Sequence, residues 1–108
     1  MYIGNVTFVI HPHHEDEFIG WMRGNALAAL FNEESAAREP RLQTVVEAGG
    51  EPVPAEHGKS IALQAEFADK EGFDAWTATQ LPPVLSDFQE KFGPQAAYFL
   101  TLLEVLPL

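Results

Sequence analysis

Residues 95–106 read QAAYFLTLLEVL, and this stretch decides the fold. Its two parities are Ala97, Phe99, Thr101, Leu103 and Val105 on one side, and Tyr98, Leu100, Leu102 and Glu104 on the other. A strand with one dry and one wet face alternates apolar and polar residues, but this stretch is apolar on both faces over most of its length. It therefore predicts a strand that is covered twice, either within one chain or by a second copy.

The composition of the chain excludes several classes of partner and of chemistry. The 108 residues fit a single domain over 1–108. Sixteen acidic residues against six Lys and Arg give a formal charge of −10, which disfavours nucleic acid and anionic membranes as partners. There is no cysteine, which excludes disulfides and thiolate chemistry. No run of sequence approaches the roughly 18–20 apolar residues of a membrane span, so we expect a cytoplasmic protein.

Hydrophobic periodicity predicts the order of the elements. We expect strands over 2–10, 41–47 and 59–67 before the final strand, and helices over 12–30 and 69–91. Gly24-Asn25 should break or bend the first helix, and Pro82-Pro83 should divide the second. Residues 32–40 form a connector and 48–58 a loop. The order β-α-β-β-α-β predicts a ferredoxin-like α+β sandwich, with four antiparallel strands and both helices on one face.

The other face of that sheet would carry no helix. When the more apolar parity of each strand is matched to the helices, the helix-free face receives Ile3, Asn5, Thr7, Val9, Ala62, Gln64, Glu66, Tyr98, Leu100 and Leu102. Leaving the large apolar side chains in water would forgo roughly 1.5–3 kcal/mol each. A homodimer that pairs the two sheets would cover them. The alternative is a monomer in which residues 32–40 or 48–58 fold back over this face.

The polar residues of this face are the candidate ligand-binding site: Asn5, Gln64, Glu66 and Tyr98. A mostly apolar space with a few polar groups is typical of a small-ligand site, and Glu66 there could serve as a base. In the alternative interpretation, Asn5 and Tyr98 bond to one another or to a partner subunit, and Glu66 lies at the rim in water.

The histidines are the other candidates for chemistry. His11, His13 and His14 precede Glu15 and Asp16 within one short turn, where side chains rarely converge on a single ion. We therefore expect a solvated helix start, with no metal site and no cofactor.

Both ends of the chain resemble a known family. The matching stretches are Tyr2-Ile3-Gly4-Asn5-Val6-Thr7, Phe18, Trp21-Met22, Phe88, Lys91-Phe92-Gly93 and Thr101-Leu102-Leu103-Glu104-Val105. In their order and spacing they resemble the uncharacterised bacterial domain-of-unknown-function family 4286. The resemblance implies a dimeric α+β barrel made from two ferredoxin-like subunits. Similar barrels include cofactor-free monooxygenases, chlorite dismutase-like haem proteins and stress-induced small barrels.

The resemblance implies no assigned activity. Relatives often carry a histidine late in the first helix and another in the second, whereas this chain reads Arg23-Gly24-Asn25-Ala26-Leu27 and Thr79-Gln80-Leu81-Pro82 there, which argues against an enzyme. The first hypothesis is therefore a non-catalytic homodimer that binds a small, fairly apolar molecule or simply assembles. One alternative is a cofactor-free monooxygenase-like enzyme for a small aromatic substrate. Another is a module whose negative surface meets a basic partner.

Overall fold

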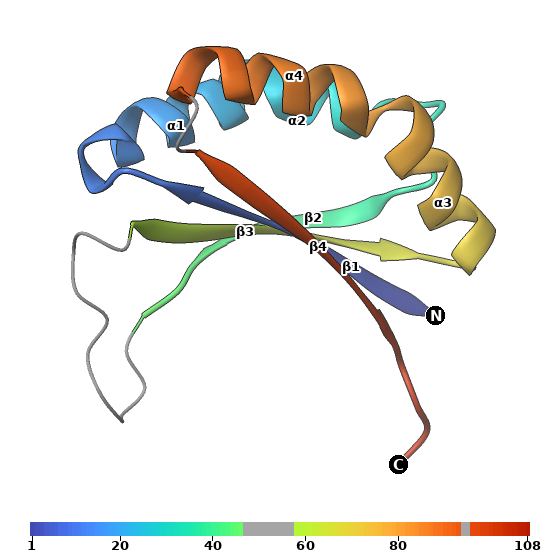
Figure 1. The fold of residues 1–108 in the computed structure, drawn as a ribbon. Coiled ribbons are helices and arrows are strands. Elements are labelled where there is room, and N and C mark those ends of the chain that lie inside the picture. The colour runs from blue at the N-terminus through green and yellow to red at the C-terminus, as the bar shows by residue number, and fades with distance from the viewer. Residues whose placement is uncertain (47–57, 94–95) are drawn as a thin grey trace.

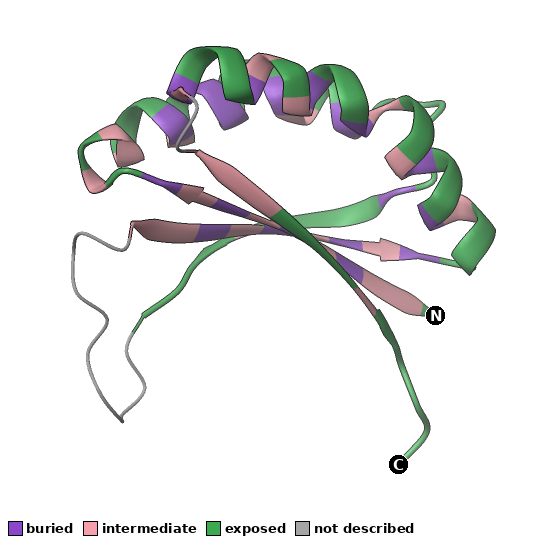
Figure 2. Cartoon of the chain, viewed as in Figure 1, coloured by how far each residue is buried: buried purple, intermediate pink, exposed green. Residues whose placement is uncertain are grey.

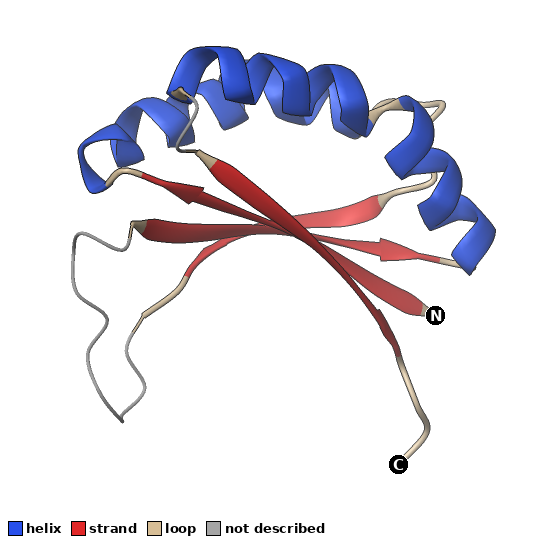
Figure 3. Ribbon diagram, viewed as in Figure 1, coloured by secondary structure: helices blue, strands red, loops and turns tan. Residues whose placement is uncertain are grey.

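The computed structural model describes residues 1–46, 58–93 and 96–108. It has two layers, a twisted four-stranded antiparallel sheet and a set of helices on one of its faces (Figures 1 and 3). The strands are β1 (Tyr2–Ile10), β2 (Arg38–Thr44), β3 (Lys59–Phe67) and β4 (Ala97–Glu104), in the order β2-β3-β1-β4. β1 lies in the middle and pairs with β3 and β4. The predicted ferredoxin-like α+β fold is confirmed.

The first helical segment changes its geometry along its length. It begins with the 3₁₀ turn η1 (Pro12–His14), continues as α1 (Glu15–Trp21), widens into the π-helical stretch η2 (Met22–Ala26) and ends as α2 (Leu27–Leu30). The predicted irregularity at Gly24-Asn25 is confirmed, because both residues lie in the π-helical stretch.

The second helical segment is divided where the prolines predict. α3 (Lys70–Thr79) is followed by α4 (Leu81–Phe92), with Pro82 and Pro83 in the first turn of α4. A proline is tolerated there because the first turn leaves its N–H groups unpaired in any case. The side chain of Asp69 caps the start of α3 by accepting a hydrogen bond from the Gly72 amide, at 2.7 Å.

The bounds predicted for the second strand are wrong. The structure places it at Arg38–Thr44 instead of 41–47, and Pro40 lies inside it. β2 is an edge strand, where a residue without an N–H group is tolerated, and the pairing shifts register between Arg38 and Arg41. Residues 32–40 therefore do not fold back over the helix-free face, because the last three of them belong to β2. The predicted loop over 48–58 falls, apart from Gly58, outside the described residues.

The core fills the space between the sheet and the helices (Figure 2). The sheet contributes Val6, Phe8, Ile10, Ile61, Leu63, Ala65 and Phe67, and the helices contribute Phe18, Trp21, Met22, Ala26, Leu30, Phe73, Trp76, Leu81, Val84, Phe88 and Phe92. The predicted parities of β1 and β3 are confirmed, since their more apolar sets are the buried ones. Trp21 and Trp76 are 5% and 2% exposed, which confirms that both are core residues.

The predicted parity of β4 is wrong. Tyr98 pairs with Phe8 and Leu100 with Val6, and directly opposite residues of an antiparallel pair project from the same face. Tyr98, Leu100 and Leu102 therefore point to the helix side, and Tyr98 and Leu102 pack against the core. The helix-free face receives Ala97, Phe99, Thr101 and Leu103 instead. Because both parities of this strand are apolar, its pattern did not distinguish the two faces.

Candidate functional site

The candidate site is the helix-free side of the sheet, which we call the open face. The strand pairings arrange its side chains in rows that cross the sheet from β2 to β4. The rows are Arg38, Glu66, Ile3 and Leu103; then Arg41, Gln64, Asn5 and Thr101; then Gln43, Ala62, Thr7 and Phe99; and finally Ser60, Val9 and Ala97. In Figure 1 no helix lies on this side of the sheet.

The β4 side of the open face is apolar and exposed. Phe99 is 59% exposed and Leu103 is 51% exposed. Val105 follows β4 and is 47% exposed; the alternation of the strand places it on the same face as Leu103. Exposed apolar side chains that gather on one face mark an interaction surface more often than isolated ones do.

The β2 side of the open face is basic. Arg38 and Arg41 are exposed there, although the whole chain has only six Lys and Arg residues. Glu66 lies directly across from Arg38 on the neighbouring strand. The open face is therefore asymmetric, with apolar surface along one edge strand and positive charge along the other.

Asn5 occupies the centre of the open face, between Gln64 and Thr101. Its Oδ1 atom is buried and has no hydrogen-bond partner among the described residues. A buried acceptor without a partner costs about 1–3 kcal/mol relative to one that is hydrogen-bonded.

The structure brings together three of the four predicted site residues. Asn5 and Gln64 are direct neighbours in one row, and Glu66 lies in the next row beside Ile3. Tyr98 is on the opposite side of the sheet, packed against the core, so the alternative interpretation in which Asn5 bonds to Tyr98 is wrong. Sequence reasoning missed the β2 and β4 members of the open face, among them Arg38, Phe99 and Leu103. The exposure of the β4 members follows from the register of β4 and not from its composition.

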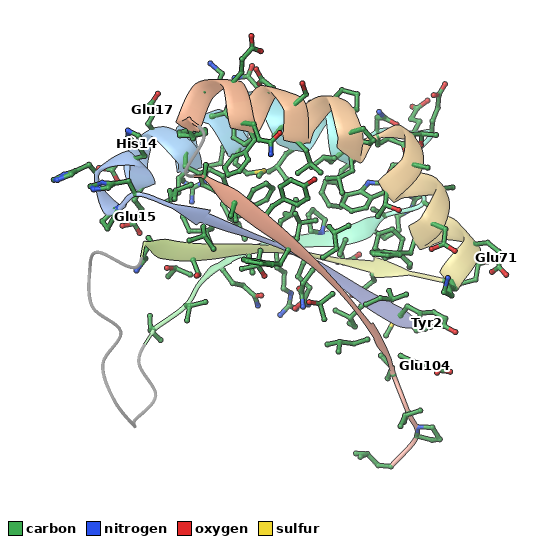
Figure 4. The ribbon with its side chains drawn as sticks, viewed as in Figure 1. Tyr2, His14, Glu15, Glu17, Glu71 and Glu104 are labelled. Carbon is green, nitrogen blue, oxygen red and sulfur yellow. The ribbon has the colours of Figure 1, made fainter. Side chains whose placement is uncertain are left out.

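His11, His13 and His14 lie away from this face, at the turn between β1 and α1. The rings of His11 and His13 stack with centroids 4.7 Å apart, and His14 lies 5.9 Å from Phe92. Figure 4 shows His14, Glu15 and Glu17 at one end of the molecule, and Tyr2, Glu71 and Glu104 at the other. Within the described ranges, no three His, Asp or Glu side chains are grouped as a metal site requires.

Two hollows open elsewhere on the described surface. One, of about 400 Å³, lies beside the start of β2 and is lined by Phe31, Asn32, Glu33, Ala37, Arg38, Glu39 and Pro40. The other, of about 180 Å³, lies between η2 and α4, where the Trp21 indole donates to Asp87 Oδ2 at 2.7 Å.

Among the described helices, none is long and apolar enough to cross a membrane.

Comparison with solved structures identifies proteins of the same fold. A candidate antibiotic biosynthesis monooxygenase from Deinococcus radiodurans is similar with a TM-score of 0.67 at 10% identity, over 100% of this chain and 95% of that one. An EthD (ethyl tert-butyl ether) family protein from Bacillus halodurans is similar with a TM-score of 0.65 at 15% identity, over 98% of this chain and 100% of that one. A further antibiotic biosynthesis monooxygenase is similar with a TM-score of 0.63 at 17% identity, over 99% of this chain and 100% of that one. These identities are low, so the likeness shows the fold alone.

Sequence comparison gives the family. No curated protein matches the sequence. The family model of DUF4286, a domain of unknown function, matches residues 1–106, which is almost the whole chain and includes all four strands that carry the open face. The chain is therefore a member of the DUF4286 family.

Proposed function

We propose that the protein is a non-catalytic homodimer whose subunits pair through their open faces and can enclose a small, fairly apolar molecule between them. The observation that carries the proposal is the gathering of Phe99, Leu103 and Val105 on one uncovered face. Each is about half exposed, so covering it gains on the order of 1 kcal/mol. Three such side chains on each of two symmetric copies give on the order of 6 kcal/mol, which is comparable with the roughly 5–15 kcal/mol that stabilises a domain.

The polar centre of the face supports the ligand-binding part of the proposal. Asn5 lies at this centre between Gln64 and Thr101, and its buried Oδ1 atom accepts no hydrogen bond from any residue that the structure describes. In a dimer, the apolar rim would exclude water and the central amides would orient the polar end of a small molecule. If these amides contact the partner subunit instead of a ligand, the protein simply assembles.

The alternative is an enzyme related to the cofactor-free monooxygenases, acting on a small aromatic substrate. The shared fold with two antibiotic biosynthesis monooxygenases favours it. The separation of Tyr98 from Asn5, Gln64 and Glu66 weighs against it, because the expected polar groups do not converge. Oxygen uptake with phenolic aromatic compounds tests this alternative: turnover that is lost in Glu66→Gln would favour the enzyme, and no uptake would favour assembly.

Two neighbouring residues of β4 provide a matched test of the dimer. Phe99 lies on the open face at 59% exposure, and Leu100 lies on the helix side at 45% exposure. We expect Phe99→Ser to weaken dimerisation about tenfold or more, which corresponds to about 1.4 kcal/mol or more. Leu100→Ser should leave the dimer intact.

Light scattering and sedimentation velocity at micromolar concentration measure the mass, and circular dichroism checks that both variants fold. A wild-type protein that is monomeric under these conditions would contradict the proposal. So would a dimer that Leu100→Ser breaks and Phe99→Ser does not.

A further inference from the structure

We propose that the small molecule held on the open face is an amphiphilic carboxylic acid, whose carboxylate binds Arg41 and whose apolar body lies toward β4. The inference rests on the proposed function and names the chemical class of its ligand. Three features of the face support it: the unpaired charge of Arg41, the amides beside it, and the distance from Arg41 to the exposed ring of Phe99.

Arg41 carries a positive charge that the described residues leave unpaired. It is exposed, and its pairing with Gln64 places it on the open face. The one ion pair among the described residues joins two residues of α3, so Arg41 has no carboxylate partner within them. Arg38 differs, because its guanidinium donates to two backbone carbonyl oxygens just before β2. Arg41 is therefore the arginine of this face that is available to an anion.

The proposed dimer makes an unpaired Arg41 unfavourable. A partner sheet over the open face removes water from this side chain, and a charge that is buried without a partner is costly. A carboxylate bound beside Arg41 supplies the missing charge, whereas a wholly apolar ligand does not. The guanidinium also offers a carboxylate two parallel N–H donors, which is the strongest form of this contact.

Side-chain amides adjoin Arg41 on two sides. Gln64 lies directly across from it on β3, and Asn5 follows in the same row on β1, at strand spacings of about 4.8 Å. Gln43 lies two residues further along β2 and belongs to the next row. Each amide has an NH₂ group that can donate to an oxygen. The Arg41 end of the row therefore has neutral donors to add to the charged one.

Glu66 restricts where the carboxylate binds. It lies directly across from Arg38, one row away from Arg41. Because like charges repel, a carboxylate is less favourable on that side of Arg41 than on the opposite side, where Gln43 lies. We therefore expect the carboxylate between Arg41, Gln64 and Gln43.

The width of the sheet sets the length of the ligand. β2 and β4 are separated by β3 and β1, so three strand spacings, or about 14 Å, lie between them. The row that begins at Gln43 continues through Ala62 and Thr7 to Phe99, which is 59% exposed. A carboxylic acid with an alkyl chain of medium length, such as decanoate, can reach from the Arg41 side chain to this ring.

Isothermal titration calorimetry with three probes of one chain length tests the inference. Decanoate, decanol and decylamine share the alkyl chain and carry a negative charge, no charge and a positive charge. They are titrated into the wild type, Arg41→Gln and Arg23→Gln. Arg23 is a matched control, because it is exposed on η2 in the helix layer. Circular dichroism checks that each variant folds, and sedimentation velocity gives its oligomeric state.

We expect decanoate to bind more tightly than decanol and decylamine, although the formal charge of −10 on the chain favours the amine. Arg41→Gln should weaken decanoate about tenfold, the loss expected for a charge-assisted hydrogen bond, and leave decanol unchanged. Arg23→Gln should change neither. Glu66→Gln should tighten decanoate, because a nearby like charge is removed.

Two results would overturn the inference while the open-face dimer stands: a dimeric wild type that binds decanoate no better than decanol, and decanoate binding that Arg41→Gln leaves unchanged. A dimer that binds no probe and that Arg41→Gln weakens would also overturn it, and would pair Arg41 with a carboxylate of the partner subunit. A monomeric wild type that binds decanoate through Arg41 would overturn the proposed dimer and support the carboxylate site.

Discussion

At the scale of single residues, Gly4 sets how closely β1 approaches the helix layer. A Cβ atom at this position would lie 2.8 Å from Phe67 Cε2 and 2.9 Å from Phe73 Cε1, inside the packed core. Gly20 on α1 differs, because nothing lies within 4 Å of a Cβ atom there. The first glycine is required by packing, whereas the second is only a poor helix former.

The two glycines therefore predict opposite effects of the same substitution. Gly4→Ala should lower the free energy of unfolding by about 1–3 kcal/mol, because rings in a packed core must shift. Gly20→Ala should raise it by about 0.5–1 kcal/mol through its helix propensity. Urea denaturation followed by tryptophan fluorescence measures both. If Gly4→Ala left the free energy of unfolding unchanged, the core around Phe67 and Phe73 would be packed more loosely than these distances indicate.

At the scale of elements, the stability of α3 depends on the hydrogen bond at its start. The Asp69 carboxylate caps α3 through the Gly72 amide, whereas Asp74 in the same helix bonds to Lys70 at 2.8 Å on the exposed surface. That hydrogen bond raises the pKa of Lys70, so the ion pair persists well above neutral pH. An exposed pair is screened by solvent and contributes little to stability.

These two aspartates form a matched pair for measurement. Asp69→Ala should destabilise the protein by about 1 kcal/mol, because an amide at the helix start loses its acceptor. Asp74→Ala should change stability by less than about 0.5 kcal/mol. Thermal and urea unfolding compare them. Equal losses from both variants would show that charge, and not capping, stabilises α3.

The elements also show how much of the fold the sequence could predict. β1 and β3 each have one strongly apolar parity, so Phe8 and Leu63 were assigned correctly to the core. The proline pair gave the division between α3 and α4. β4 offers Leu100 on one parity and Leu103 on the other, and only pairing with β1 separates them. The β1 and β3 residues of the open face followed from the parity of those strands, whereas its β4 residues depend on register, which a single strand does not encode.

At the scale of the whole molecule, the protein is a thin slab. Its extents are 37 × 36 × 19 Å, which fits one sheet with one layer of helices. Stacking two open faces would convert two half-covered sheets into a four-layer particle with both sheets inside. Each chain also carries a formal charge of −10, so association brings two strongly negative bodies together.

Salt should therefore strengthen the proposed dimer. Raising the ionic strength from about 0.05 M to 0.5 M shortens the Debye length and screens the repulsion between subunits. The dissociation constant from sedimentation should fall, while that of Phe99→Ser stays higher than wild type at every salt concentration. A dissociation constant that rises with salt would indicate an interface held by ion pairs instead of apolar contact.

The shift of register in β2 has a consequence for concentrated solutions. Glu39 adopts a φ of 53° and Pro40 has no amide hydrogen, so the outer margin of the sheet is a poor template for another strand. Ladder growth from chain to chain, the route to fibrils, is interrupted at this point. Even at high concentration, the protein should form discrete particles and not polymerise.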